Sequence, residues 1–270
     1  MSGRKTYWRV LTIAGSDCGG GAGIQADLKT FAANGCYGMS VITALTAQNT
    51  QGVSGIHPVP VGFVAQQIEA VLGDIGADAV KIGMLYSPEL IETVARKLRE
   101  HGVGRIVLDP VMVAQSGDKL LQDDAVAALK ETLIPQAEII TPNLPEAEVL
   151  LGHSVGEAEM ADAATELARL GCRNVLVKGG HGEGASSTDC LRLGEDGRTV
   201  WIEAGRIATM NNHGTGCTLS SAIAARIAQG DRLEAAVRQA KDYITGAIRA
   251  GADYRLGHGH GPVHHFWPYW

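Results

Sequence analysis

The sequence predicts an α/β protein with a mostly parallel central sheet, helices on both faces and an antiparallel hairpin at one edge. Short apolar runs that end in glycine or polar residues alternate with amphipathic stretches from residue 10 to residue 177. Such alternation is typical of a parallel sheet covered on both faces. Two further runs, 188–193 and 199–203, flank the hairpin signal at 194–197. The chain shows no repeat or linker, which favours a single domain over residues 1–270.

The expected elements follow from the spacing of apolar residues. Strands are expected at 10–14, 39–45, 79–82, 105–108, 139–141 and 175–177. Helices are expected at 24–33, 63–72, 88–99 and 125–133, from 143 onward, and at 219–228 and 233–250. Open α/β sheets bind ligands beyond the C-terminal ends of their strands, so the residues at these ends should share one crevice. These residues are Gly15, Gln48, Met84, Asp109, Asn143 and Lys178.

Composition argues against several classes of protein. The net charge is −6, and Lys and Arg never cluster in runs longer than two, which disfavours nucleic-acid binding. No apolar run is long enough to span a bilayer, and the run after Arg4 and Lys5 resembles a core strand more than a signal peptide. The five cysteines are odd in number and form no CxxC pair, which predicts reduced thiols in the cytoplasm.

One stretch, residues 211–220, combines glycines, a cysteine and the start of a helix. A helix N-terminus offers unpaired N–H groups and the positive end of a dipole, so it is a natural anion site. The same field should shift Cys217 toward the thiolate. An anion site beside a reactive side chain indicates group transfer, and phosphoryl transfer above all. The alternative is a glycine turn followed by a merely buried cysteine.

The glycine-rich loop after the first strand also has two interpretations. Gly21, Gly23 and Ala26 fit a relaxed dinucleotide fingerprint between a strand and a helix. However, the second strand leads to Gln48 rather than to an acid that could bind a ribose. We therefore expect a loop that lies over a substrate.

Three further features could be structural or functional. Asn143 and Glu146 could form a capping box, or could hold magnesium and phosphate at a helix start. Lys178 could be a solvated strand end, or could neutralise a nucleotide phosphate. The histidine-rich tail, residues 257–265, has no accompanying carboxylate or cysteine and is expected to be a structural strap.

Ten short motifs occur in order along the whole chain. They are AGSD (14–17), GGAGIQADLKT (20–30), SVITAL (40–45), AQNT (47–50), KIGML (81–85), DPVM (109–112), TPNLPEA (141–147), VKGGH (177–181), HGTGCTLS (213–220) and GPVHHF (261–266). Together they resemble the bacterial hydroxymethylpyrimidine/phosphomethylpyrimidine kinases of thiamine biosynthesis. The resemblance implies a ribokinase-like fold and two ATP-dependent steps. The first phosphorylates the alcohol of 4-amino-5-hydroxymethyl-2-methylpyrimidine, and the second converts the monophosphate to the diphosphate.

The resemblance also implies site residues, with Mg²⁺ as cofactor and a cytosolic homodimer as the working form. Cys217 takes the position of the catalytic base, and the anion hole is formed by Gly214, Thr215 and Gly216. Gln48 matches the family residue that reads the pyrimidine, and its amide offers a donor and an acceptor together, which suits a ring nitrogen beside an exocyclic amine. The pocket walls would be Gly15, Met84 and Val111, with Asp27 at the rim. On the ATP side lie Asn143 and Lys178, with Glu146 and, as a weaker candidate, Asp109 for the metal.

Two alternatives stay open. Some members of the group phosphorylate pyridoxal, and those most similar to this chain carry a second cysteine after the Asp-Pro-Val-Met motif. Ala114 and Gln115 stand in that region here, which favours the pyrimidine. A non-catalytic ligand sensor is disfavoured by the intact Cys217, Glu146 and Lys178, and ADP release that depends on the pyrimidine alcohol would exclude it.

Two residues depart from the family pattern. Asn212 stands where threonine is usual, so this position lacks a hydroxyl that could contact phosphate. Cys18 stands where serine or proline is more usual, and its place in the glycine-rich loop should leave it accessible to thiol reagents.

Overall fold

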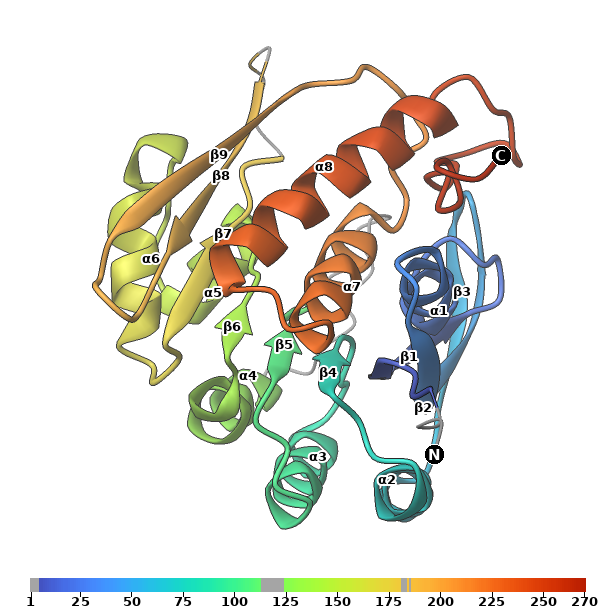
Figure 1. The fold of residues 1–270 in the computed structure, drawn as a ribbon, viewed down its shortest axis with the longest axis vertical. Helices are drawn as coiled ribbons and strands as arrows, with labels where there is room; N and C mark the ends of the chain where they lie inside the picture. The colour runs from blue at the N-terminus through green and yellow to red at the C-terminus, as the bar shows by residue number, and fades with distance from the viewer. Residues whose placement is uncertain (1–4, 113–123, 181–183, 185) are drawn as a thin grey trace.

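The computed structural model describes residues 5–112, 124–180, 184 and 186–270, among which nine strands form a single sheet (Figure 1). The strand order is β3-β2-β1-β4-β5-β6-β7-β8-β9. The mutually parallel strands are β1 (Arg9–Asp17), β2 (Tyr37–Asn49), β4 (Ala79–Ile82), β5 (Ile106–Leu108), β6 (Ile139–Ile140) and β7 (Asn174–Val177). Antiparallel strands lie at both ends of the sheet, and these are β3 (Gly52–Pro58), β8 (Ser186–Arg192) and β9 (Thr199–Gly205).

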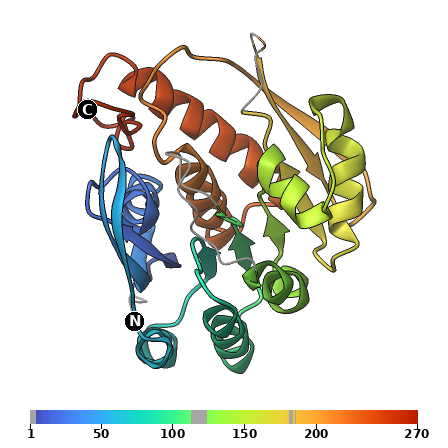
Figure 2. The same cartoon turned by 180° about the vertical axis from the view of Figure 1, so that it is seen from behind.

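Helices cover both faces of this sheet (Figures 1 and 2). One layer consists of α1 (Gly23–Ala33), α7 (Thr215–Ala228) and α8 (Leu233–Gly251). The other consists of α2 (Val61–Asp74), α3 (Pro88–Glu100), α4 (Ala125–Ala128), α5 (Leu144–Leu151) and α6 (Met160–Ala168). Each layer buries its own apolar core, with Phe31 and Ile223 in the first and Ile68 and Leu90 in the second. A π-helical turn, Leu129–Leu133, continues α4.

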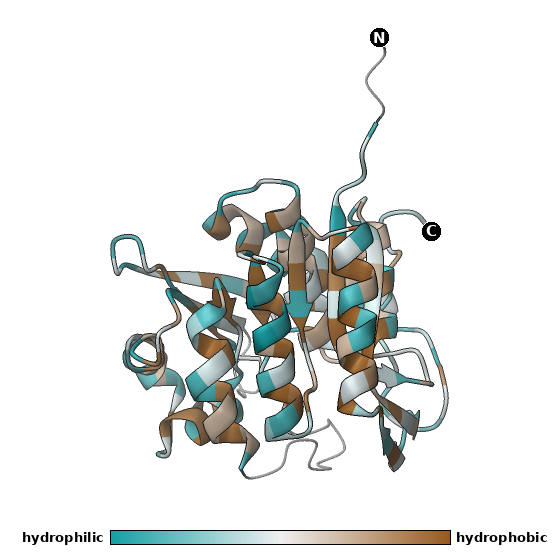
Figure 3. Cartoon of the chain, turned by 90° about the horizontal axis from the view of Figure 1, so that it is seen from below, coloured by the Kyte–Doolittle hydropathy of each residue, from teal (hydrophilic) through white to brown (hydrophobic). Residues whose placement is uncertain are grey.

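Helix α3 shows how the residue pattern produces this packing. Leu90, Ile91 and Leu98 are fully buried, while charged residues occupy the opposite side, and the helices accordingly carry hydrophobic and hydrophilic stripes (Figure 3). Ser87 Oγ caps the helix by accepting a hydrogen bond from the Leu90 N–H at 3.3 Å. Pro88 occupies the first helical position, where its missing N–H has no cost. No helix in the described part of the chain is long and apolar enough to cross a bilayer.

The predicted parallel strands, the hairpin at 188–203 and the helices are confirmed, with ends that differ by a few residues. Strand β3 and helix α6 were not predicted. Strand β3 pairs antiparallel with β2 and so adds a second antiparallel edge to the predicted hairpin edge, which is confirmed. Five of its seven residues are exposed, and it contains two glycines and a proline, so it lacks the apolar alternation of a strand. Helix α6 buries Ala163, Ala164 and only two larger side chains, which gives a weak periodic signal.

Two glycine loops interlock beside the start of α7. Gly214 is the N-cap residue of this helix and has a φ of +80°, which L side chains rarely adopt. A Cβ at Gly214 would lie only 1.9 Å from the carbonyl oxygen of Gly21, in the loop after β1. The loop after β1 therefore packs directly against the backbone at the start of α7.

We predict that Gly214→Ala destabilises the protein by at least about 2 kcal/mol, because strain in the left-handed region adds to a backbone collision. The matched control is Gly62→Ala in the first turn of α2, where a Cβ would have no neighbour within 4 Å. The control should leave stability unchanged or slightly higher. Urea unfolding midpoints check both variants, and equal midpoints for the two would contradict the interlock.

Candidate active site

The C-terminal ends of β5, β6 and β7 bring together a buried carboxylate and a lysine. Lys178, which follows β7, places Nζ 2.8 Å from Oδ1 of Asp109, which follows β5. Thr141 Oγ1, after β6, donates to the same oxygen at 3.0 Å. Burial opposes ionisation of Asp109, but Lys178 and Lys81 outweigh it and lower the pKa of this carboxyl. Asp109 is therefore an anion at neutral pH and fixes the Lys178 ammonium.

Asn143 and Glu146 form the expected capping box at the start of α5. Asn143 Oδ1 accepts the Glu146 N–H, and Glu146 Oε2 accepts the Asn143 N–H, both at 2.8 Å. The same Oε2 lies 3.8 Å from Lys178 Nζ, so the cap adjoins the Asp109–Lys178 pair. Burial raises the pKa of Glu146 to about 7, with Asp109 adding to the shift and Lys178 opposing it. The structural role of Glu146 thus coexists with a carboxyl that is partly protonated near neutral pH.

The first turn of α7 faces this group. Thr215 is the first helical residue, as the anion-hole prediction requires. A Cβ at Gly216 would lie 3.4 Å from Lys178 Nζ and 3.6 Å from Asp109 Oδ2. Ser220 Oγ, one turn further, lies 3.2 Å from the same Asp109 oxygen. A helix N-terminus and an ammonium group therefore meet around one point, an arrangement that favours a bound anion.

Cys217 lies in the first turn of α7, but the expectation of a lowered pKa is wrong. Burial raises the pKa of its thiol to about 11, with Lys81 opposing the shift and Asp27 and Asp109 adding to it. The Gly23 N–H donates to the sulfur, which stabilises the thiolate only in part. Desolvation and two carboxylates therefore outweigh the helix end, and Cys217 is a thiol at neutral pH.

Asp27 lies beneath the site rather than at its rim, so its predicted position is wrong. The residue is 0% exposed, and Lys81 Nζ lies 3.0 Å from each of its carboxylate oxygens. Ser221 Oγ donates to Oδ1 at 2.7 Å, and Thr12 Oγ1 donates to Oδ2 at 2.6 Å. Charged residues are rarely buried without a partner, and here the partner comes from β4, 54 positions away.

Two of the predicted pocket walls lie together. A Cβ at Gly15, near the end of β1, would lie 3.1 Å from Met84 Sδ, so glycine permits this close approach. Thr43 Oγ1 donates to the Met84 carbonyl at 2.8 Å and fixes its backbone. Val111 instead stands beside Asp109, whose carbonyl accepts its N–H at 2.8 Å. Ala114 and Gln115 lie outside the described residues.

Gln48 belongs to a cluster of polar side chains, with His213 and Asp17, that the sequence did not predict. Its Nε2 lies 3.4 Å from His213 Nε2, and that ring nitrogen lies 3.0 Å from Asp17 Oδ2. Asp17 is 3% exposed and also accepts the N–H groups of Gly21 and Ala22, both at 2.9 Å. His213 and Asp17 each stand inside a motif quoted above, so the signal was present, but their contact spans 196 positions. The cluster joins the predicted substrate reader to the loop before α7.

The C-terminal segment packs against the same loop, as expected of a strap. The Gly261 carbonyl accepts the His213 N–H at 3.0 Å, and the Thr50 carbonyl accepts the His260 N–H at 2.8 Å. His260 Nδ1 lies 3.0 Å from Asn212 Oδ1, which gives the atypical Asn212 a contact inside the protein. The strap therefore ties the β2–β3 turn to the start of α7.

The donor atoms at the strand ends fit a magnesium ion that arrives with a nucleotide. Within the described ranges no three His, Cys, Asp or Glu side chains form a metal cluster. Mg²⁺ is commonly held by one or two carboxylates together with phosphate oxygens and waters. Glu146 and Asp109 supply such oxygens beside Lys178, so the residues fit a shared rather than a protein-enclosed ion.

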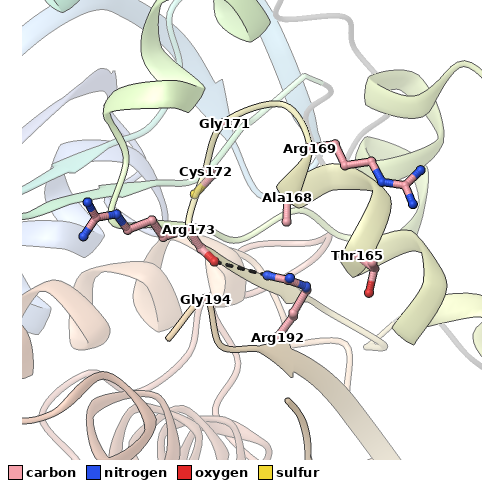
Figure 4. Close-up of a pocket in the computed structure, with 8 residues that line it drawn as sticks. All are labelled: Thr165, Ala168, Arg169, Gly171, Cys172, Arg173, Arg192 and Gly194. Atoms are coloured by element: carbon pink, nitrogen blue, oxygen red, sulfur yellow. Dashed lines mark hydrogen bonds between the residues drawn. The ribbon is translucent and has the colours of Figure 1, made fainter. Parts of the chain in front are cut away.

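A cavity of about 350 Å³ lies away from this site, at the amino end of β7 (Figure 4). Arg192 Nη1 lies 3.4 Å from the Arg173 carbonyl across it, while the Arg169 and Arg173 side chains extend to opposite sides. Lys178 follows the other end of the same strand. The cavity therefore lies at the N-terminal end of β7, whereas the site residues described above lie at the C-terminal ends of the strands.

Comparison with known proteins gives consistent matches. The sequence matches the family described as phosphomethylpyrimidine kinase over residues 17–264. It is 55% identical over 263 residues to the hydroxymethylpyrimidine/phosphomethylpyrimidine kinase of Rhizobium meliloti, with 96% of this chain and 97% of that protein covered. It is also 55% identical over 258 residues to the thiamine biosynthesis bifunctional protein ThiED of Geobacter sulfurreducens. That match covers 95% of this chain, which spans only 52% of that longer relative.

Solved structures agree with the ribokinase-like fold predicted from the motifs. The pyridoxal kinase of Staphylococcus aureus in complex with ADP has a TM-score of 0.90 at 34% identity, over 98% of this chain and 96% of that one. The phosphomethylpyrimidine kinase of Clostridium difficile has a TM-score of 0.77 at 46% identity, over 89% of this chain and 99% of that one. Sequence identity is thus higher to the pyrimidine kinase than to the pyridoxal kinase. With the family match across most of its length, the chain belongs to the hydroxymethylpyrimidine/phosphomethylpyrimidine kinase family.

Proposed function

We propose that this chain transfers a phosphoryl group from ATP to the alcohol of 4-amino-5-hydroxymethyl-2-methylpyrimidine, and then a second one to the monophosphate. The observation that carries the proposal is the meeting of the α7 N-terminus with Lys178 and Asp109 at Gly216. Backbone N–H donors and an ammonium around one point stabilise the charge that develops on a transferred phosphoryl group. Membership in the family supports the choice of substrate.

On the nucleotide side, Lys178 and Asn143 would contact the ATP phosphates, and Glu146 with Asp109 would hold Mg²⁺. Bound Mg²⁺ would neutralise charge on the phosphate oxygens. Asp109 keeps Lys178 extended toward the α7 N-terminus, so the ammonium need not reorganise when the phosphates bind. The S. aureus relative in complex with ADP supports use of an adenine nucleotide.

On the acceptor side, Gln48 would pair with the aminopyrimidine edge, between walls formed by Gly15, Met84 and Val111. The approach of Gly15 to Met84 supports a narrow apolar wall suited to a flat ring. Asp27 would act from below the site, through Lys81, because its carboxylate is fully buried. The backbone N–H groups of Gly214–Gly216 would bind the phosphoryl group while it is transferred. The distance between this anion hole and the bound pyrimidine ring would determine where the acceptor alcohol lies.

Cys217 would orient the acceptor hydroxyl rather than act as a preformed thiolate. A thiol with a pKa near 11 is ionised in only about one molecule in ten thousand at pH 7. Phosphoryl transfer passes through a loose transition state, in which the alcohol proton need not leave early. A neutral sulfur that accepts a hydrogen bond from the hydroxyl can therefore assist the first step modestly.

The thiol pKa can be measured by alkylation. In a Cys18→Ser variant, which lacks the exposed thiol of the glycine-rich loop, Cys217 should react slowly with iodoacetamide at pH 7. Its rate should rise about tenfold per pH unit up to about pH 10, because only the thiolate reacts. Peptide mass spectrometry over a pH series measures this rate. Equal labelling at pH 7 and pH 9 would show that Cys217 is already a thiolate.

The two steps should respond differently to Cys217→Ala. The second acceptor is a phosphate oxygen that is already anionic, whereas the first is an alcohol that must lose a proton. We expect the first step to slow by about 10- to 100-fold and the second to change by less than about threefold. Single-turnover rates with the alcohol and with the monophosphate measure the two steps separately. Equal losses would rule out a specific contact between Cys217 and the acceptor hydroxyl.

Phosphorus NMR of the products tests the function as a whole. The chain is incubated with ATP, Mg²⁺ and either the pyrimidine alcohol or pyridoxal. A diphosphate formed from the pyrimidine supports the proposal, whereas pyridoxal phosphate as the sole product would overturn it. Pyridoxal is the second candidate because the S. aureus pyridoxal kinase has the higher TM-score, 0.90 against 0.77.

The proposal includes a cytoplasmic homodimer, carried over from the family resemblance. Five free cysteines support a reducing compartment. Sedimentation velocity of the purified chain tests the dimer, and a single monomer boundary at micromolar concentration would reject it.

A further inference from the structure

The side-chain amide of Gln48 lies between two groups whose single hydrogen is already used. Its Oε1 lies 3.2 Å from Thr46 Oγ1, but the Thr46 hydroxyl also donates to the Ser16 carbonyl at the shorter distance of 2.9 Å. Its Nε2 lies 3.4 Å from His213 Nε2, which lies 3.0 Å from Asp17. A hydroxyl carries one hydrogen, and a protonated imidazole nitrogen likewise carries one. Neither end of the amide is therefore well paired in this orientation.

Asp17 decides which nitrogen of His213 carries the hydrogen. Burial opposes ionisation of Asp17, but the hydrogen bonds from His213 and from backbone N–H groups outweigh it and lower the pKa of the carboxyl. An ionised carboxylate has no hydrogen to give, so His213 Nε2 must be the donor in their contact. His213 Nε2 consequently cannot accept a hydrogen bond from the amide nitrogen of Gln48.

Exchanging the oxygen and nitrogen of the amide removes the donor–donor contact with His213. The amide oxygen would then be a second, weaker acceptor for the Nε2–H that His213 donates to Asp17, and the amide nitrogen would face a free lone pair on Thr46 Oγ1. We propose that Asp17 and His213 are positioning residues that hold the Gln48 amide in this second orientation, and so determine which heterocycle edge the site accepts. The exchange changes no heavy-atom position beyond the amide itself.

The surroundings of His213 keep its ring in place for this task. A Cβ at Gly21 would lie 2.4 Å from His213 Cδ2 and 3.2 Å from His213 Nε2, so this edge of the ring packs directly against that glycine. The backbone of His213 is fixed from the other side by its hydrogen bond to the Gly261 carbonyl. The His213 side chain is only 13% exposed, so the surrounding residues leave the ring little room to rotate. Its orientation is therefore set by packing as well as by Asp17.

The orientation has a chemical consequence for the ligand, and this step rests on the proposed function. With its oxygen toward His213, Gln48 presents an acceptor on that side and a donor on the Thr46 side. A 4-aminopyrimidine matches this pattern, since its exocyclic amine donates and the adjacent ring nitrogen accepts. A 4-oxo analogue has the reverse pattern and would need the amide turned over. The pair should therefore exclude oxo-pyrimidines.

The tautomer can be tested without substrate. Two-bond ¹⁵N–¹H correlation spectra of the full-length protein report which ring nitrogen of His213 is protonated. We expect the Nε2–H form in the wild type and a mixture of forms in Asp17→Asn, because an amide can accept or donate. A wild-type ring protonated at Nδ1 alone would overturn the proposal whatever the substrate proves to be.

Specificity provides the second test, with kcat and KM measured for the 4-amino alcohol, its 4-oxo analogue and ATP. The wild type should prefer the amino compound by at least about 100-fold in kcat/KM. His213→Leu and Asp17→Asn should each reduce this preference about tenfold through the pyrimidine KM, with the KM for ATP changed less than about twofold. His213→Gln keeps an N–H donor at this position and should retain most of the preference.

The outcomes separate the possible failures. An unchanged amino/oxo preference in both His213→Leu and Asp17→Asn would overturn the positioning role. Equal losses for both pyrimidines and for ATP would indicate general damage to the loops and would overturn it as well. If Asp17→Asn does not fold, the comparison of His213→Leu with His213→Gln still decides. Absence of turnover with either pyrimidine in the wild type would reject the proposed function, while the tautomer measurement would stand by itself.

Discussion

Two buried carboxylates form hydrogen bonds with side chains of helix α7, and the geometry of the site depends on these contacts. Ser220 and Ser221 are adjacent in the helix, and their hydroxyls contact Asp109 and Asp27 at 3.2 and 2.7 Å. Neighbouring side chains on a helix point about 100° apart. Two such contacts therefore fix both the rotation of α7 about its axis and its position along that axis. Burying two carboxylates costs several kcal/mol each unless they are paired, and two lysines supply the charge that makes it tolerable.

Lys81 and Lys178 have different roles, although each neutralises a buried aspartate. Lys81 is completely buried, so it can act only through the electrostatic potential that it sets beneath Cys217 and the α7 N-terminus. Lys178 is 12% exposed, and its ammonium reaches the space next to Gly216. The site thus has a fixed positive charge under it and a second one at its surface. The Lys178 ammonium can therefore contact an anion at the α7 N-terminus without requiring the protein to rearrange.

Most of the fold could be predicted because the parallel strands are buried on both faces, which leaves continuous apolar runs in the sequence. Strand β3 is mostly exposed and left no such run. Site residues at strand ends followed from topology alone, as with Asp109 and Lys178. The burial of Asp27, the raised pKa of Cys217 and the role of His213 depend on partners far along the chain, and no local pattern encodes such pairings.

The strap at residues 257–265 can contact the loop before α7 only after all of the described strands have been synthesised. Gly261 bonds to His213, and His265 Nε2 lies 3.1 Å from Thr218 Oγ1 in the first turn of α7. A chain emerging from the ribosome can pair its strands as they appear, because every strand precedes the strap. The loop before α7 gains its final hydrogen bonds only after residue 266 has emerged. A chain that ends before these residues therefore lacks the hydrogen bonds that fix the loop before α7.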